Sequence, residues 1–297
     1  MIRLIATITV VRGPHPASAN GNVRTSHPVS ASPMTDKAIV RLEREGAVAT
    51  LVLARPEAGN AVSLALCQAF HDAVETCAAD ASVRAVLIRA EGAAFCVGGD
   101  LAEFQGRGDE RPAHLMKLAP VFHAAQARLM TMPAPVVVAV QGAAAGAGLG
   151  LALCGDIVLA AASARFTLAY TAIGLSPDGG STHLLPRLIG LRRTQDLMLT
   201  NRRLTAAEAL DMGLVTEVLA DRHLETRARE VALRLAAGPT QAYGEVKRLL
   251  SLTFERGFAA QTDDEGDAIA RLSGGDDAAE GIDAFFAKRP PVFAGKP

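Results

Sequence analysis

Two glycine-rich turns in this sequence place main-chain groups where they can do chemistry. The first turn is EGAAFCVGGDLAEF, residues 91–104, and its glycines precede Asp100 and Glu103. An Asp-x-x-Glu order resembles a capping box at the start of a helix, where backbone N–H groups lack partners within the helix. Glycines before such a start, here Gly98 and Gly99, let an oxygen atom of another molecule approach the main chain closely. Taken alone, the turn is also consistent with an ordinary capped helix.

The second turn, QGAAAGAGLGLALCGD at residues 141–156, repeats the arrangement of strand, small residues and helix. Two such turns can aim two N–H donors at one point and form an oxyanion hole, which is worth about 2.7–4 kcal/mol of transition-state stabilisation per donor. A competing interpretation is a dinucleotide-binding fingerprint beginning at Gly146 and Gly148. The spacing disfavours it, because Leu151 stands where the third glycine belongs, and neither turn continues into the Gly-Lys-Ser/Thr of a P-loop.

A carboxylate with an unusual setting follows in the stretch YTAIGLSPDGGSTHLLPR, residues 170–187. Asp178 lies between a proline and two glycines, and an aspartate there can act as a general acid or base if the fold turns it toward a substrate. The same Pro-Asp-Gly order is also a plain type I turn, in which most aspartates are solvated. Ser181 and His183 lie two residues apart without a nucleophile elbow, so we expect structural roles for them.

Alternating strand and helix patterns must position these segments. Residues 38–55 alternate apolar and polar side chains about Glu45-Gly46 and predict a β-hairpin. After Thr182 the pattern is helical apart from a strand at 213–219. Between these parts the patterns predict a helix at 64–79, a strand at 84–90, a helix at 112–131, a strand at 135–142, a short helix at 149–155 and strands at 156–161 and 165–169. A sheet-bearing core therefore precedes a helical tail.

Composition limits the function classes. The 297 residues carry 30 basic and 31 acidic side chains without a basic block, which argues against nucleic acid or membrane as a partner. The four cysteines lack Cys-x-x-Cys spacing, so we expect no metal cage and a reducing, cytoplasmic setting. Residues 1–37 are rich in Pro, Ser and Asn and predict a disordered leader or an over-long start. Their arginine, short apolar run and Ala17-Ser18-Ala19 also fit a secretory signal.

Six segments together resemble the crotonase, or enoyl-CoA hydratase/isomerase, superfamily, in the order in which that family has them. They are RPEAGNAVS (55–63), AAFCVGGDL (93–101), QGAAAGAGLGLALCGDIVLA (141–160), FTLAYTAIGLSPDGGSTHLLPRLIG (166–190), LTAAEALDMGLV (204–215) and FFAKRPPVFAG (285–295). The resemblance implies an α/β fold, a ClpP-like spiral of ββα units, with the crotonase core at 38–203. It also implies that the helical region 204–297 packs against neighbouring copies in a homotrimer or a hexamer made of two trimers.

The resemblance further implies an acyl-CoA thioester substrate, with no metal, flavin or nicotinamide cofactor. The thioester oxygen would lie between the N–H groups of Gly99 and Ala147, which the family pattern places in the oxyanion hole. Asn60 and Ala61 would lie near the CoA nucleotide. Other substrate contacts would fall on the two turns and beside them, at Val97, Gly98, Asp100, Leu101, Gly146, Gly150 and Tyr170.

This sequence departs from the typical hydratases of the family, which use two glutamates. Gly150 and Tyr170 stand at those positions, so syn hydration by the usual pair should be absent or weak. Gly150 is also expected to leave room beside the substrate. Asp178 corresponds to a position that certain isomerases of the superfamily use for proton transfer. Its GLSPD context and the 238–250 segment most resemble the ring-1,2-epoxyphenylacetyl-CoA isomerase branch of phenylacetate degradation.

We therefore predict an acyl-CoA isomerase, of fatty acid or phenylacetate metabolism, that shifts a double bond or opens an epoxide ring with Asp178 as its proton shuttle. A hydratase of low activity and a catalytically silent acyl-CoA-binding protein remain alternatives, since both usual glutamates are replaced. Two expectations concern residues outside the site. Asp156 should accept a hydrogen bond from an N–H group or an arginine, and Lys247 and Arg248 should lie on a solvent-exposed helix face, with contact to a CoA phosphate as the alternative.

Overall fold

The sheet begins with the predicted hairpin. The computed structural model describes residues 38–295, so the leader interpretation of residues 1–37 lies outside the described residues. Strands β1 (Val40–Glu45) and β2 (Val48–Leu53) pair antiparallel, and all later neighbours in the order β1-β2-β3-β4-β6-β9 are parallel. The other members of this six-stranded sheet are β3 (Ala85–Ala90), β4 (Val136–Val140), β6 (Ile157–Ala161) and β9 (Glu217–Leu219).

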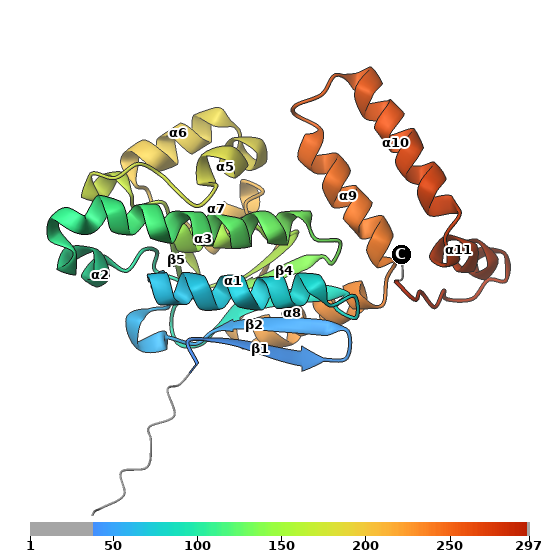
Figure 1. Cartoon of the computed structure of the whole chain (residues 1–297), viewed down its shortest axis with the longest axis horizontal. Coiled ribbons are helices and arrows are strands. Elements are labelled where there is room, and N and C mark those ends of the chain that lie inside the picture. The colour runs from blue at the N-terminus through green and yellow to red at the C-terminus, as the bar shows by residue number, and fades with distance from the viewer. Residues whose placement is uncertain (1–37, 296–297) are drawn as a thin grey trace, which may run out of the picture. The chain divides into compact units, whose positions relative to one another are not determined.

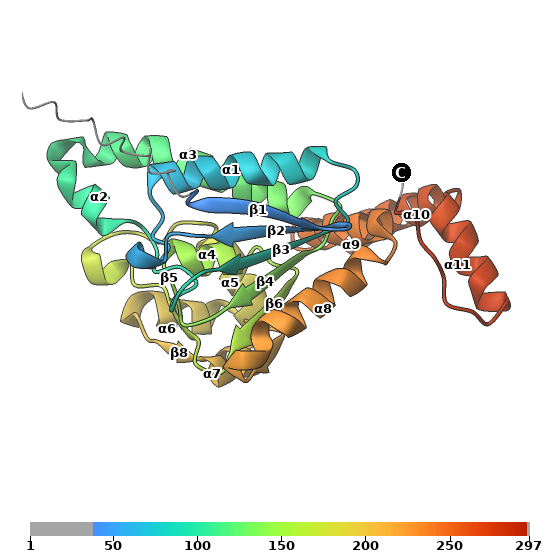
Figure 2. The same ribbon diagram turned by 90° about the horizontal axis from the view of Figure 1, so that it is seen from below.

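Helices cover both faces of this sheet, because its parallel strands carry apolar side chains on both sides. Every residue of β4 is buried. Helices α1 (Leu64–Ala79) and α3 (Arg111–Thr131) pack on one face, and α8 (Leu224–Ala236) packs on the other, as Figures 1 and 2 show. The buried residues of α1 recur at intervals of three and four, which is the pattern that predicted this helix.

A second, three-stranded sheet holds the second glycine turn. Its strands are β5 (Ala143–Ala145), β7 (Arg165–Thr167) and β8 (Leu204–Thr205), and helix α4 (Ala147–Ala152) follows β5 almost directly. The two residues of β8 are too few to give a strand pattern in the sequence, so this strand was not predicted. Its pairing with β7 fixes the chain on either side of the Asp178 stretch to the same sheet.

The other helices of the described residues connect the strands or form the C-terminal region. They are η1 (Pro56–Ala58), α2 (Leu101–Gly106), η2 (Gly108–Glu110), η3 (Thr171–Ile173), α5 (Ser181–Ile189), α6 (Leu191–Thr200), α7 (Ala206–Asp211), η4 (Asp221–His223), α9 (Thr240–Leu252), α10 (Phe258–Ser273) and α11 (Asp276–Phe286). Figures 1 and 2 place α10 and α11 beyond α9, away from the six-stranded sheet.

The predicted capping box at the start of α2 is half present. Asp100 caps α2, because its carboxylate accepts a hydrogen bond from the N–H of Glu103 at 3.1 Å. The Glu103 carboxylate does not reach back; it accepts from the N–H of Leu64 at 3.1 Å, in the first turn of α1. One side chain therefore joins the starts of α1 and α2, and the first glycine turn is fixed against the helix layer.

The expectation that Lys247 is exposed is wrong. Only 8 % of its side chain is exposed, and its Nζ lies 2.9 Å from Asp156 Oδ2. The same ammonium donates to the carbonyl oxygens of Leu129 at 2.9 Å and Ala134 at 3.2 Å. Asp156 also accepts from the N–H of Val136 at 2.8 Å, which confirms the predicted N–H partner, while its cation is a lysine and not an arginine. This ion pair joins α9 to the core.

All four cysteines are free and buried. Burial raises the pKa of the Cys77 thiol to about 11, and it raises the pKa of Cys67, Cys96 and Cys154 to about 12. Because the thiolate is the reactive form, these side chains are inert hydrophobic residues in the folded protein.

We expect the native protein to resist a chromogenic disulfide reagent at neutral pH and to release all four thiols after unfolding in guanidinium. The measurement is the absorbance of the released thiolate with time, with and without denaturant. A native thiol that reacts as fast as free cysteine would contradict the burial described here.

Candidate active site

The first glycine turn lies between the loop before α1 and strand β5. The N–H of Val62 donates to Gly98 O at 2.7 Å, and the N–H of Asp100 donates back to Val62 O at 3.1 Å. On the other side, Cys96 forms a parallel bridge with β5. Within residues 38–295 no acceptor takes the N–H of Gly99, which lies between these bonds. Hydrogen bonds of the adjacent residues fix the position of this N–H group, which itself has no hydrogen-bond partner in the described residues.

The two glycine turns contact each other main chain to main chain. Gly98 has φ +98°, and a Cβ on it would lie 2.9 Å from the carbonyl oxygen of Ala145. A Cβ on Gly148 would lie 2.3 Å from the carbonyl oxygen of Cys96. Only glycine fits at both positions, because backbone atoms on the opposite turn cannot move aside as a flexible side chain can. The close approach holds the two turns against each other at Gly98 and Gly148.

The second turn supplies the other donor. Gly146 has φ +50° and its N–H donates to Thr167 O of β7 at 3.0 Å, so the pairing of β5 with β7 extends to the residue before α4. Ala147 is the first residue of α4. Its N–H cannot find a partner inside the helix, and among the described residues no other acceptor takes it.

Both donors line one cavity of about 350 Å³ together with Asp178. Most of the wall is apolar, contributed by α2, α3 and the segment around η3, and it includes Val97, Leu101, Phe104, Leu115, Leu118, Phe122, Leu168, Ile173 and Leu175. Asp178 is the only carboxylate among the described residues that line it. The cavity can therefore hold an apolar group beside two main-chain donors and one acid.

Asp178 lies in the loop between η3 and α5, and its side chain is 41 % exposed. Its Oδ1 lies 2.6 Å from Nε2 of His123, on α3. Within the described part of the chain, Oδ2 has no hydrogen-bond partner. Ser181 is fully buried and its hydroxyl donates to the main-chain oxygen of Asp178 at 2.8 Å, a structural role as expected. His123 was not identified from the sequence.

Residues 43–296 match the family model described as Enoyl-CoA hydratase/isomerase. The chain belongs to the enoyl-CoA hydratase/isomerase family. It is 34 % identical to trans-2-decenoyl-[acyl-carrier-protein] isomerase of Streptococcus mutans, over 85 % of this chain and 96 % of that protein. It is 37 % identical to 1,2-epoxyphenylacetyl-CoA isomerase of Escherichia coli, over 85 % of this chain and 97 % of that protein.

A solved structure of an enoyl-CoA hydratase from Polaromonas sp. JS666 superposes with a TM-score of 0.81 at 33 % identity, covering 85 % of this chain and 98 % of that one. The predicted crotonase fold is thereby confirmed. In the described residues, no helix is long and apolar enough to cross a membrane, and no cluster of three His, Cys, Asp or Glu side chains could hold a metal ion.

Within this enoyl-CoA hydratase/isomerase, Gly150 does not leave room beside the substrate, so that expectation is wrong. A Cβ on Gly150 would lie 2.4 Å from the carbonyl oxygen of Gly179, the residue after Asp178. Gln126, a buried side chain of α3, donates to the same carbonyl at 3.0 Å. The loop that carries Asp178 therefore lies directly on α4, and the absence of a side chain at position 150 is what lets it lie there.

Tyr170, the second position at which the family resemblance leads us to expect a glutamate, lines the cavity. The Cζ end of its ring lies 3.6 Å from where a Cβ on Gly146 would be. Burial, together with the nearby Asp178 carboxylate, raises the pKa of the phenol. The Tyr170 hydroxyl is buried without a hydrogen-bond partner among the described residues. A phenol in this state stays protonated at neutral pH and does not act as a base.

Five of the expected substrate contacts lie off the cavity wall: Asn60, Ala61, Gly98, Asp100 and Gly150. Asn60 is fully buried, and its amide nitrogen donates to Glu91 O and Ala94 O at 2.9 Å each. Its amide oxygen accepts from the N–H of Arg55, so the side chain is used within the protein. Asp100 pairs with Arg55 at 2.6 Å. Burial raises the pKa of Asp100, but the guanidinium and the N–H groups of α2 lower it further, to below its ordinary value.

Gly150→Ala should lower the free energy of unfolding by about 1–3 kcal/mol, as overpacking does, because the new methyl group pushes on a backbone carbonyl. Gly106→Ala is the matched control, since a Cβ at the exposed end of α2 meets nothing within 4 Å. The control should be neutral or stabilising by up to about 1 kcal/mol. Chemical denaturation of both variants checks this, and equal stabilities would refute the contact between Gly150 and Gly179.

Proposed function

We propose that this protein is an acyl-CoA isomerase that moves a double bond, or opens an epoxide ring, in an unsaturated acyl thioester. One observation carries the proposal: Asp178 is the only carboxylate, among described residues, that lines a cavity also lined by Gly99 and Ala147, whose N–H groups are unpaired. The relatives named as isomerases support the same reaction class.

The chemistry needs one acid and two donors. In a 3-enoyl thioester, Oδ2 of Asp178 takes a proton from the α carbon, and the electrons of that C–H bond enter a dienolate. The N–H groups of Gly99 and Ala147 hold the negative oxygen, where each donor is worth about 2.7–4 kcal/mol. The protonated carboxyl then returns the proton to the γ carbon, and the double bond ends between C2 and C3. The same carboxyl group takes and returns the proton, so a single carboxylate is sufficient.

Hydration is disfavoured by the same geometry. Addition of water requires groups that bind and deprotonate a water molecule beside the double bond. At position 150 the backbone of Gly179 occupies the space of a side chain, and at position 170 a protonated phenol faces the cavity. A hydratase of low activity and a silent acyl-CoA-binding protein are the two outcomes that compete with this proposal.

The cavity suggests a neutral acyl group. Its wall contributes aliphatic and aromatic side chains, and the described residues on it include no lysine or arginine. An acyl group with a terminal carboxylate would leave an unpaired charge in this setting, which is costly. We therefore favour a straight-chain or ring-bearing hydrocarbon acyl group.

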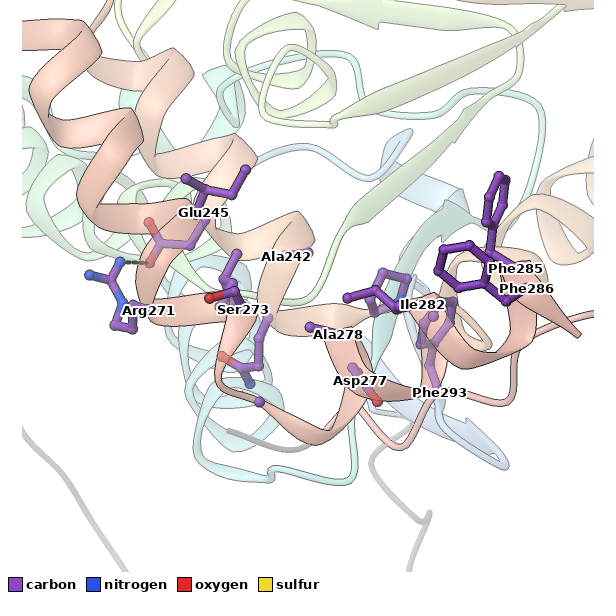
Figure 3. A pocket seen from close by; sticks show the side chains of 16 residues that line it. Ala242, Glu245, Arg271, Ser273, Asp277, Ala278, Ile282, Phe285, Phe286 and Phe293 are labelled. Carbon is purple, nitrogen blue, oxygen red and sulfur yellow. Dashed lines mark ion pairs between the residues drawn. The ribbon is translucent and has the colours of Figure 1, made fainter.

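We also propose that the C-terminal helices join copies of the chain, as the family resemblance implies. Phe285 and Phe286 are exposed to 78 % and 79 % at the end of α11. They border a hollow of about 770 Å³ between α9, α10 and α11, shown in Figure 3. The charged groups of this hollow are already paired, for example Glu245 with Arg271 at 2.7 Å. An apolar surface of this kind on one helical region favours a contact between subunits.

Asp178→Asn should lose at least about a hundredfold in the conversion of 3-hexenoyl-CoA to the conjugated thioester, because an amide cannot accept the proton. The measurement follows conjugation by absorbance. Binding of the thioester should persist, as a rise in melting temperature on adding it. Asp72→Asn is the matched control, since Asp72 also contacts a histidine, His71, but lies on α1 outside the cavity.

The same assay separates the competing functions. Faster hydration of crotonyl-CoA than isomerisation of 3-hexenoyl-CoA would favour the hydratase. Stabilisation by both thioesters without turnover of either would favour the silent binder. Unchanged turnover in Asp178→Asn would remove Asp178 from the mechanism.

Light scattering should find three or six copies of the wild-type chain, and the double variant Phe285→Glu, Phe286→Glu should shift toward monomer, because buried unpaired charges oppose association. Met116→Glu changes another exposed apolar side chain, on α3, and should leave the assembly intact. A monomeric wild type, or a double variant with unchanged mass, would contradict the proposed contact.

A further inference from the structure

The pair formed by His123 and Asp178 has more than a packing role. His123 is 44 % exposed and does not line the cavity, so neither core packing nor direct substrate contact accounts for its position. Its Nε2 nevertheless lies 2.6 Å from Asp178 Oδ1, a short distance typical of a charge-assisted hydrogen bond. An ionised carboxylate can only accept, so Nε2 carries the proton in this contact.

Helix α3 holds the Asp178 loop at two neighbouring points. Gln126 lies three residues after His123, on the same helix face, and binds the main-chain oxygen of Gly179 at 3.0 Å. Gln126 is buried and fixes the course of the loop. The one hydrogen bond that the His123 side chain forms with the described residues goes to the carboxylate. The loop backbone is therefore set without His123, and what His123 adds is the orientation of one side chain.

That orientation matters because the carboxylate is 41 % exposed and is held by one hydrogen bond within the described residues. Without His123, rotation about the Cα–Cβ and Cβ–Cγ bonds can turn both oxygens toward water. With Oδ1 held, Oδ2 is the free oxygen of a side chain that lines the cavity. A shuttle that takes a proton at one carbon and returns it at another needs this atom to stay in place between the two steps.

We propose that His123 is a positioning residue for proton transfer by Asp178. Its Nε2–H binds Oδ1 and thereby presents Oδ2 to the acyl group as the one oxygen that breaks the α C–H bond and forms the γ C–H bond. The inference rests on the proposed isomerase function and deepens it, since it assigns the two oxygens of the shuttle different tasks.

The test compares His123→Ala and His123→Gln in the full chain, with 3-hexenoyl-CoA deuterated at the α carbon. His123→Ala should lower kcat about ten- to a hundredfold, the range expected for a misplaced catalytic group, with KM changed by less than about threefold. The fraction of product that carries deuterium at the γ carbon should also fall, because a loosened carboxyl group exchanges with water before it returns the deuteron. Mass spectrometry measures that fraction.

Rescue separates positioning from folding. His123→Gln keeps an N–H donor and should retain more of both kcat and γ-deuterium than His123→Ala, and added imidazole should restore part of the alanine variant. His71→Ala is the matched control, because His71 contacts Asp72 at 3.4 Å on α1, away from the cavity. It should match the wild type in rate and in deuterium transfer.

The outcomes distinguish this inference from the proposed function. If the wild type isomerises, Asp178→Asn does not, and His123→Ala keeps the wild-type kcat and γ-deuterium, the positioning role alone is overturned. A loss in His123→Ala that neither glutamine nor imidazole relieves, at an unchanged melting temperature, also counts against it. If the wild type does not isomerise, or Asp178→Asn is fully active, the proposed function and this inference fail together.

Discussion

The close contact between the two glycine turns is the constraint on which the rest of the site depends. The oxygens of Ala145 and Cys96 lie within 3 Å of where side chains on Gly98 and Gly148 would begin, so the turns can meet only as bare main chain. That contact brings the unpaired N–H groups of Gly99 and Ala147 to one cavity wall. Donors fixed in this way lose nothing to reorganisation when charge develops on a bound oxygen.

The lack of a side chain at position 150 also determines where the acid of the cavity can lie. Position 150 cannot hold a carboxylate, because the carbonyl of Gly179 lies 2.4 Å from any Cβ there. The loop that fills this space is the one that carries Asp178. The acid of this cavity therefore lies on the segment before α5 and not on α4, and Gly99 and Ala147 line the same wall. In the proposed isomerase, this loop supplies the base while the two glycine turns supply the hydrogen-bond donors.

Most of the fold follows from local sequence patterns, whereas the residues expected on the cavity wall came from the family resemblance. The hairpin, the buried β4 and the amphipathic α1 are each coded within a short window, and glycine pairs mark both turns. Local patterns do not give the contacts of Asn60, Lys247 and His123, because each contact depends on which distant part of the chain the fold places beside that side chain. Asn60 and Lys247 bind carbonyl groups far along the chain, and His123 meets a residue 55 positions away. A helical pattern gives the face of α3 that is buried, but not the loop that its edge contacts.

Helix α3 links the shape of the cavity to the position of its acid. Leu118 and Phe122 form part of the apolar wall, while His123 and Gln126 hold the loop of Asp178. These residues lie within three turns of one helix. An acyl group that shifts α3 by packing against Leu118 and Phe122 must also shift the hydrogen bonds to Asp178 and Gly179. In the proposed isomerase, α3 therefore couples the fit of the acyl chain to the position of Asp178, and a poorly fitting acyl group is expected to lose turnover more than binding.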